Sequence, residues 1–263
     1  MPIVDDNPTL IKPKSKQVLV KYLDLIKFIS LLNNQALFFC RLDILEDKFE
    51  GTTARKNRQL RINSWASSNR PKTFNSPTSK EQIINNVNNY FEFEEKLKSL
   101  TLINCWNKSN NESAALWKIY SDNGKGIMIK TTVESLMKSL QYSSEIIRIS
   151  EVNYIDYERE EMLDGNTMFP IIHKQNAYHY EEEVRLFHEI DSDFNFTYNW
   201  SKEKVKEGRN IKVDIDELIN EIVIGPFTPI WIIDLIKDIC LKYKLNKEIS
   251  LSKLTLPIES FSD

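Results

Sequence analysis

The chain has 263 residues, of which 41% are hydrophobic, 28% charged and 11% aromatic. This is the composition of an ordinary globular protein that forms one large domain or two small ones around a sizeable core. Its 35 basic and 38 acidic residues leave a net charge of −3, which argues against a dedicated nucleic-acid coat protein, although a local basic groove would not show in that total.

The N-terminal part predicts a lead-in, a strand, a helix and a second strand. Residues 1–16 contain three prolines and little pattern, so we expect a loosely ordered lead-in there. Val18 to Tyr22 is typical of a strand. Asp24 is typical of the N-cap of an amphipathic helix, which Asn33-Asn34 would end. Residues 36–40 are all apolar and favour a central strand, after which an acidic turn begins.

The segment 52–70 is basic, and two interpretations of it stay open. The solvated face of a helix is the commoner outcome, and a phosphate-binding patch is the alternative. Residues 71–82 predict an exposed loop, and 82–97 an Asn-rich charged helix. The basic side chains of the segment are Arg55, Lys56, Arg58, Arg61 and Arg70.

Residues 101–132 predict a strand, a polar loop, a short helix and a second strand. Asn110 and Asn111 are expected to cap the short helix, and Asn123-Gly124 to end it. Thr131 and Glu134 have the spacing of a capping box for a further helix at 133–140.

This central stretch also carries the first candidate site. A polar loop between apolar strands is a common place for a site, and the alternative is a capped connection that holds two core tryptophans. The candidate residues are Asn104, Trp106, Asn107, Glu112, Ser113, Trp117 and Tyr120.

A second polar group lies at 181–190, within EEEVRLFHEI. If this segment is a strand, Glu181, Glu183, Arg185 and Phe187 share one face because side chains alternate along a strand. Two carboxylates and an arginine on one face indicate a site, and a surface ion pair is the equally simple alternative.

The remaining segments complete an α+β pattern. We expect strands at 146–157, 211–215, 221–225 and 249–254, irregular chain at 158–170 and 193–208, and a helix at 230–243. In that helix Trp231, Leu235 and Ile239 have the spacing of core residues. The fold class predicted is a single α+β domain at 17–263, with a mixed, mostly antiparallel sheet that is open to a split arrangement, and flanking helices.

Cysteine and glycine usage, with the hydropathy pattern, excludes several classes of protein. Cys40, Cys105 and Cys240 are widely spaced in apolar context, which predicts buried thiols of a cytoplasmic protein and no zinc site. No run of transmembrane length and no signal-like start is present, so we expect no membrane association. The chain has six glycines and neither a GxGxxG motif nor a Walker loop, which excludes standard Rossmann and P-loop nucleotide binding.

Six short pieces of sequence follow one another in a recognisable order. They are Lys21-Tyr22 before an amphipathic helix, LFFCRLDILEDKFEG, INCWNKSNNESAALWKIYSDNGKGIMI, VNYIDY, YEEEVR and EIVIGP. In this order they resemble the bacterial family called domain of unknown function 2971, from about Leu19 onward. Lys21 stands where such proteins often have arginine, and Lys48 where they often have proline. The resemblance implies no reaction, because the family has none assigned.

A fold-level similarity to ADP-ribosyltransferases suggests a reaction. Those enzymes clamp NAD in a split sheet without a glycine-rich loop. The similarity implies that Glu183 stabilises the oxocarbenium-like sugar, with Arg185 on the same strand, and that Glu181 orients the acceptor. It further implies that Lys21 or Arg41 binds phosphate. The other residues predicted to bind the nucleotide are Tyr22, Asp47, Glu50, Trp106, Asn107, Glu112, Ser113, Trp117 and Tyr120.

Two other functional classes stay open. Asp47, Glu50, Glu181 and Glu183 could hold Mg²⁺ in a nuclease or phosphodiesterase. The same residues could instead form the polar network of a non-catalytic sensor or interaction module. The partners expected are a small-molecule nucleotide, a protein or nucleic-acid acceptor, and a regulator encoded nearby, as for a toxin or a phage-defence effector.

Overall fold

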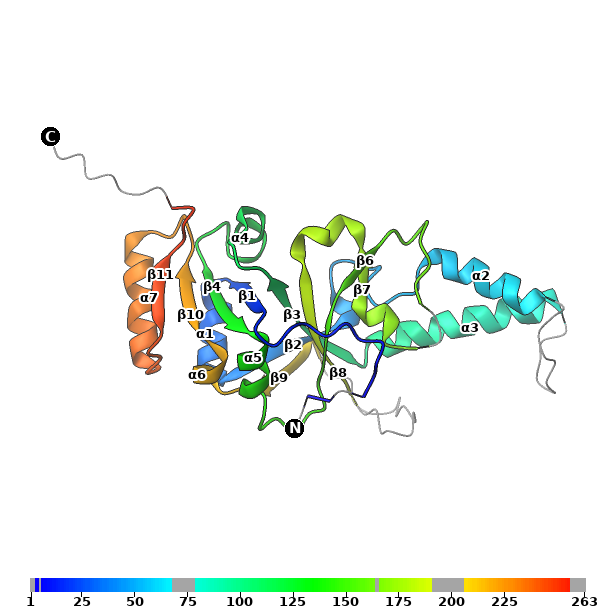
Figure 1. Cartoon of the computed structure of the whole chain (residues 1–263), viewed down its shortest axis with the longest axis horizontal. Helices are drawn as coiled ribbons and strands as arrows, with labels where there is room; N and C mark the ends of the chain where they lie inside the picture. The colour runs from blue at the N-terminus through cyan, green and yellow to red at the C-terminus, as the bar shows by residue number, and fades with distance from the viewer. Residues whose placement is uncertain (1–2, 5, 68–78, 164–165, 191–205, 256–263) are drawn as a thin grey trace.

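The computed structural model describes residues 3–4, 6–67, 79–163, 166–190 and 206–255. Within them a nine-stranded sheet forms the centre of the molecule, in the order β11-β10-β4-β1-β3-β2-β9, with β8 added on β3 and β5 on β8 (Figure 1). The strands are β1 (Val18–Leu23), β2 (Ala36–Arg41), β3 (Thr101–Lys108), β4 (Ile127–Thr132), β5 (Arg148–Glu151), β8 (Glu183–Glu189), β9 (Gly208–Lys212), β10 (Glu221–Ile224) and β11 (Glu248–Leu251).

The sheet is mixed and mostly antiparallel, as the sequence predicts. Only β10 and β11 pair in parallel among the sheet's described strands. A separate parallel pair joins β6 (Asn153–Ile155) to β7 (His173–Gln175). Together with the flanking helices this confirms the α+β class.

Strand β3 is where the sheet divides. β8 pairs along one edge of it, from Thr101 opposite Glu189 to Asn107 opposite Glu183. The other edge is shared, because β2 pairs at Leu102 and Ile103, and β1 pairs at Asn107 and Lys108. In the described chain, residues 104–106 therefore have no ladder partner on that edge, so their polar groups must find side chains. This gap positions one wall of the candidate site.

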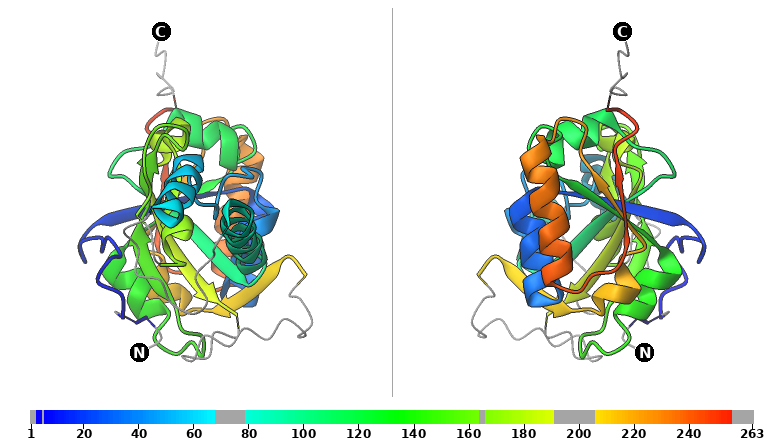
Figure 2. Two further views of the ribbon diagram at one scale, coloured as in Figure 1. Left: turned by 90° about the vertical axis from the view of Figure 1, so that its right-hand side faces the viewer. Right: turned by 90° about the vertical axis from the view of Figure 1, so that its left-hand side faces the viewer.

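Helices cover both faces of the sheet. The largest apolar cluster joins the strands to α1 (Leu25–Asn34), α5 (Val133–Ser139), α6 (Ile215–Leu218) and α7 (Ile230–Lys242). α1 and α7 lie beside each other on this face (Figure 2). On the other face, α4 (Ala114–Tyr120) packs Leu116 and Trp117 against β1, β4 and β10.

A further apolar cluster lies beside β3 and β8. It joins Ile103 and Phe187 to the short helices η1 (Leu42–Ile44) and η2 (Phe169–Ile172). A third short helix, η3 (Asn176–Glu181), leads directly into β8. From this side α2 (Arg55–Ala66) and α3 (Lys80–Lys98) project away from the sheet as a pair (Figure 1).

Helix starts follow capping chemistry, with two corrections to the sequence prediction. Asp24 caps α1 as expected, because its carboxylate accepts a hydrogen bond from the Lys27 amide at 2.7 Å. Helix α4 begins later than Asn110-Asn111 would place it, since the Ser113 hydroxyl accepts from the Leu116 amide. For α5 the cap is Thr132, one residue beyond the expected Thr131.

Four expected strands have different bounds. The segment 146–157 divides at Val152 into β5 and β6, which belong to different sheets. The strand expected at 211–215 is β9, which begins at Gly208, and Ile215 already starts α6. Glu181 ends η3, and Glu182 at φ 42° turns the chain into β8, so Glu181 is not on the strand. The expected strand at 249–254 begins at Glu248 and ends at Leu251.

The core prediction for α7 is wrong at two positions. Trp231 is 68% exposed and Leu235 40% exposed, while Ile236 and Cys240 are buried. The buried positions lie one residue further along the helix than the expected ones. Packing against α1 and the sheet sets the rotation of the helix about its axis, and the apolar periodicity of its sequence does not.

The cysteines are unpaired thiols, with Cys240 buried and Cys40 and Cys105 only partly so. In the expected lead-in, Leu10 is buried and the Ile11 amide bonds Ser150, so the domain boundary stays a prediction. Within the described chain no helix combines the length and apolar character that crossing a membrane requires. Most of the expected loop at 71–82 and of the irregular segment 193–208 lies outside the described residues.

Candidate functional site

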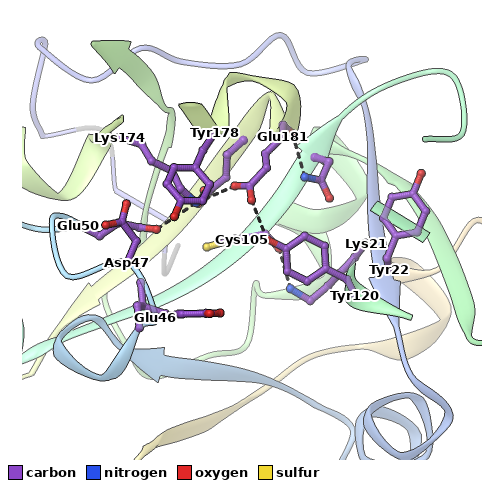
Figure 3. A pocket seen from close by; sticks show the side chains of 13 residues that line it. Lys21, Tyr22, Glu46, Asp47, Glu50, Cys105, Tyr120, Lys174, Tyr178 and Glu181 are labelled. Atoms are coloured by element: carbon purple, nitrogen blue, oxygen red, sulfur yellow. Dashed lines mark hydrogen bonds and ion pairs between the residues drawn. The ribbon is translucent and has the colours of Figure 1, made fainter. Parts of the chain in front are cut away.

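A cavity of about 290 Å³ opens beside the gap in the sheet (Figure 3). Its walls come from β1, β3, the start of β8, the end of α4, β7 with η3, and the acidic turn after η1. We call it the acidic pocket. It is lined by Lys21, Tyr22, Leu45, Glu46, Asp47, Glu50, Cys105, Asn107, Tyr120, Lys174, Tyr178, Glu181 and Glu183.

An ion pair between Glu183 and Arg185 forms the floor below the pocket. Arg185 is fully buried and donates from Nε to Glu183 Oε1 at 2.7 Å and from Nη2 to Oε2 at 3.0 Å. The same guanidinium donates to Glu50 Oε2 at 2.6 Å and to the Ile171 carbonyl at 2.7 Å. Because a guanidinium and a carboxylate are both planar, these paired bonds hold Glu183 in one orientation.

Lys174 joins three carboxylates from two parts of the chain. Its ammonium lies 2.6 Å from Glu181, 3.0 Å from Glu50 and 3.4 Å from Glu183. The side chain is 7% exposed, so these contacts are made away from bulk water. A cluster of three carboxylates and two cations keeps one net negative charge next to the pocket.

The pocket has three tyrosines on its walls. Tyr120 donates a 2.6 Å hydrogen bond to Glu181 Oε1, and the Tyr178 ring centroid lies 4.7 Å from the Lys174 ammonium. Tyr22 accepts from the Ser113 amide and meets Trp117 edge to face at 4.9 Å. These rings give the acidic pocket flat aromatic surfaces beside its charged groups.

Lys21 occupies the gap in the sheet. Its ammonium donates to the Cys105 carbonyl at 2.6 Å and lies 5.5 Å from the Trp106 ring centroid. The Asn104 side chain likewise donates to the Phe38 carbonyl at 2.9 Å. Both side chains thus donate hydrogen bonds to backbone carbonyls beside the gap, in place of the amides that a continuous sheet would have provided.

Burial and charge set the protonation states. Burial alone would raise the pKa of Glu183, but the charges of Arg185 and Lys174 outweigh it and hold that pKa at about 2. Burial would lower the pKa of Lys174, and Glu183, Glu50 and Glu181 together raise it above its ordinary value. Glu183 therefore stays ionised and Lys174 stays protonated at neutral pH.

Three neighbouring side chains have pKa values that burial shifts. Burial raises the pKa of the Tyr120 hydroxyl, and its bond to Glu181 raises it further, so Tyr120 stays a proton donor. Burial lowers the pKa of Lys21, since desolvation disfavours its charged form. Burial also raises the pKa of the Cys105 thiol, with the Glu183 charge adding to the effect, which leaves Cys105 protonated.

Eight of the predicted site residues meet in the acidic pocket, although they come from four separate segments. They are Lys21, Tyr22, Asp47, Glu50, Asn107, Tyr120, Glu181 and Glu183. Arg185 lies directly behind the pocket wall, bonded to Glu183 and Glu50. Their functional roles stay predictions.

Five predicted residues do not line the pocket. Arg41 pairs with Asp43 at 2.7 Å, and Trp106 is buried in the main core. Trp117 is also buried, and its indole N–H donates to Glu112. Glu112 bonds Ser252 and the Lys253 amide as well, and Ser113 caps α4.

Sequence reasoning missed Lys174, Tyr178 and Cys105 as pocket residues. Lys174 follows His173 on β7, and no local pattern indicates that it reaches Glu50. The one available signal was charge, because a buried carboxylate pair requires cations and Arg185 alone cannot neutralise three carboxylates.

The magnesium alternative meets a geometric difficulty. Glu50, Glu181 and Glu183 each have an oxygen within 3.4 Å of Lys174, so a cation would have to displace the ammonium. In the described ranges no group of three or more candidate ligands has metal-binding geometry.

Comparison with known proteins gives one match. Residues 116–186 match the model of a family described as Protein of unknown function (DUF2971). The matched stretch runs from α4 to β8, and it includes Tyr120, Lys174, Glu181 and Arg185. The match supports the family resemblance over this stretch, and the resemblance of the rest of the chain stays a prediction. No curated protein and no solved structure matches the chain.

Proposed function

We propose that the acidic pocket binds the nicotinamide riboside end of NAD and cleaves its N-glycosidic bond, transferring ADP-ribose to an acceptor. The observation that carries this proposal is Glu183, a carboxylate at the pocket wall that Arg185 and Lys174 keep ionised. A permanent negative charge at that position favours a sugar that becomes positively charged as nicotinamide leaves.

The rest of the lining is consistent with this ligand. Five carboxylates line the pocket against two lysines, which favours the positively charged nicotinamide ring of NAD. Tyr22, Tyr120 and Tyr178 offer faces for that ring. In the described chain Asp47 Oδ2 is buried without a hydrogen-bond partner, so it is available to accept a ribose hydroxyl.

The size of the cavity limits what it encloses. At about 290 Å³ it is at the small end for a ligand pocket, so it would hold a ring and a ribose while the remaining nucleotide lies outside. Lys21, which donates to the Cys105 carbonyl, is the cation placed to contact phosphate.

In the proposed step, the bond between the ribose anomeric carbon and the nicotinamide nitrogen breaks, and its electron pair leaves with nicotinamide. A lone pair of the acceptor forms the new bond to the anomeric carbon. The acceptor proton passes to the carboxylate of Glu181, which Tyr120 and Lys174 orient through its two oxygens. The acceptor is a protein or nucleic-acid nucleophile, or water.

The test combines thermal melting with nicotinamide release. NAD at a hundredfold excess over its dissociation constant should stabilise the folded protein by about 2.7 kcal/mol. Tyr120→Phe keeps the ring and removes the donor to Glu181, so it should keep the fold and lower nicotinamide release by about tenfold or more. Glu183→Gln should abolish release.

The control is Glu221→Gln, which removes a carboxylate paired with Lys130 outside the pocket and should leave release unchanged. An unchanged melting temperature with NAD, together with no release of nicotinamide, would overturn the proposal. A melting shift with Mg²⁺ alone would overturn it too, in favour of the phosphodiesterase alternative.

A further inference from the structure

A second cavity shares no lining residue with the acidic pocket and lies on the projecting pair of helices α2 and α3. Its volume is about 1040 Å³, the larger of the two. Both helices extend beyond the sheet, so the cavity is a groove on a protruding arm rather than part of the core (Figures 1 and 2). We call it the hairpin groove. It is lined mainly by amide, aromatic and hydroxyl side chains of both helices.

The charged residues of α2 are all basic. Its sequence RKNRQLRINSWA has four basic residues and no acidic one. In a chain with a net charge of −3, such a concentration of positive charge favours a negatively charged partner. Near the start of α2, Arg55 pairs with Glu158, and Lys56 donates to the Arg159 carbonyl, which holds this end of the helix against the body of the protein.

The other two arginines stack on the aromatic rings of α3. The Arg61 guanidinium lies 3.6 Å from the Tyr90 ring centroid, and that of Arg58 lies 5.5 Å from the Phe91 ring centroid. Arg58 also donates to the Asn88 side chain across the two helices. These contacts hold two planar cations in place before any ligand arrives.

Flat side chains line the groove itself. Trp65 on α2 and Tyr90 and Phe93 on α3 line it together with Arg61, and each is partly exposed. Aromatic and guanidinium planes beside positive charge are the combination that holds unpaired bases, since every base has a face to stack and a phosphate to attract a cation. A paired duplex would present only its phosphates to such a groove.

We infer that the hairpin groove binds single-stranded nucleic acid, with bases stacked on Trp65 and Phe93 and phosphates held by Arg61, which lines the groove, and by Arg58, one helical turn before it on α2. This inference is independent of the NAD chemistry, because it uses no residue of the acidic pocket. It favours the phosphate-binding interpretation of the basic segment over the solvated face.

The test is fluorescence anisotropy of the full-length protein with labelled oligonucleotides of about twelve residues, as single-stranded RNA, single-stranded DNA and duplex. Both single strands should bind more tightly than the duplex. Trp65→Ala should weaken single-strand binding by about tenfold through lost stacking. Arg58→Gln with Arg61→Gln should weaken single-strand binding. It should also make the negative slope of log affinity against log salt shallower by about 1.4, the value for two phosphate contacts.

The matched control is Lys237→Gln with Lys242→Gln, which removes the same charge from α7 at the other end of the molecule. It should bind as the unmodified protein does. Melting of every variant establishes that it is folded, and Trp65→Ala supplies the test if the double arginine variant does not fold. Equal affinity for duplex, binding no tighter than about 10⁻⁴ M, or an equal loss in the α7 control would each overturn the inference.

Discussion

Single residues determine the charge of the acidic pocket. Glu183 has a bidentate contact with Arg185, and Lys174 joins the same carboxylate to Glu50 and Glu181. Each charge is buried, so each depends on the others to replace the water it has lost. The cluster serves two purposes at once, because it holds three chain segments together and keeps a carboxylate ionised at the pocket wall.

Removing the guanidinium should therefore be costly. Arg185→Met leaves Glu183 and Glu50 buried without their main cation, and the free energy of unfolding should fall by about 3–5 kcal/mol in urea denaturation. Arg55→Met removes an arginine from an exposed pair with Glu158 and should cost less than about 1 kcal/mol. A similar cost for both variants would contradict the view that burial makes the Arg185 pairs essential.

At the scale of elements, tertiary contacts decide which side of a helix is buried. Helix α7 is apolar on more than one side, with Ile230, Trp231 and Leu241 exposed and Ile236 buried. Its own sequence is therefore compatible with several orientations. Packing against α1 and the sheet selects the one that buries Ile236 and Cys240.

This selection predicts opposite effects for two large apolar residues of α7. Ile236→Ala opens a cavity in the main core and should lower the free energy of unfolding by about 2–5 kcal/mol. Trp231→Ala removes a larger side chain that is 68% exposed, and it should change that energy by less than about 1 kcal/mol. Chemical denaturation of both variants checks the orientation of α7, and a larger loss for Trp231 would contradict it.

At the scale of the molecule, the sheet connects a helical body to a projecting arm. α7 lies at one end of the long axis, and α2 with α3 at the other (Figure 1). The acidic pocket lies at the gap between β1 and β2, where Lys21 and Asn104 replace sheet hydrogen bonds. The buried charges thus lie where the sheet is interrupted, and the basic helix α2 lies in the projecting arm.

The buried cluster also predicts how the whole protein responds to acid. Since the folded-state pKa of Glu183 is lowered from 4.5 to about 2, the unfolded chain takes up its proton first as pH falls. The stabilisation is complete above about pH 5 and is lost between pH 5 and 2, with a magnitude of about 3 kcal/mol. Arg185 and Lys174 lower the pKa of this carboxyl, and Glu50, Glu181 and Cys105 are the other titratable groups beside it.

Urea denaturation between pH 3 and pH 7 measures this dependence. The unmodified protein should lose more stability on acidification than Glu183→Gln, which has no proton to bind at that position. Equal acid sensitivity of the two proteins would show that Glu183 does not have a lowered pKa in the folded state.

The sequence by itself determined most of the local structure. Short-range periodicity and capping chemistry predicted the first strand and the helix that Asp24 caps, because both depend on neighbours within a few residues. Alternation predicted that Glu183 and Arg185 share a face, and the mostly antiparallel α+β class followed from the order of elements. The errors at Ser113, Thr132 and Val152 are shifts of element bounds by a few residues.

Only the tertiary structure decided what meets in the pocket. Lys174 reaches Glu50 across more than a hundred residues of chain, and Lys21 finds the Cys105 carbonyl because two strands share one edge of β3. No local pattern encodes these pairs, since a buried charge is satisfied by whichever partner the packed chain brings near it. The same reason placed Arg41 and Trp117 outside the pocket, although their residue types suited it.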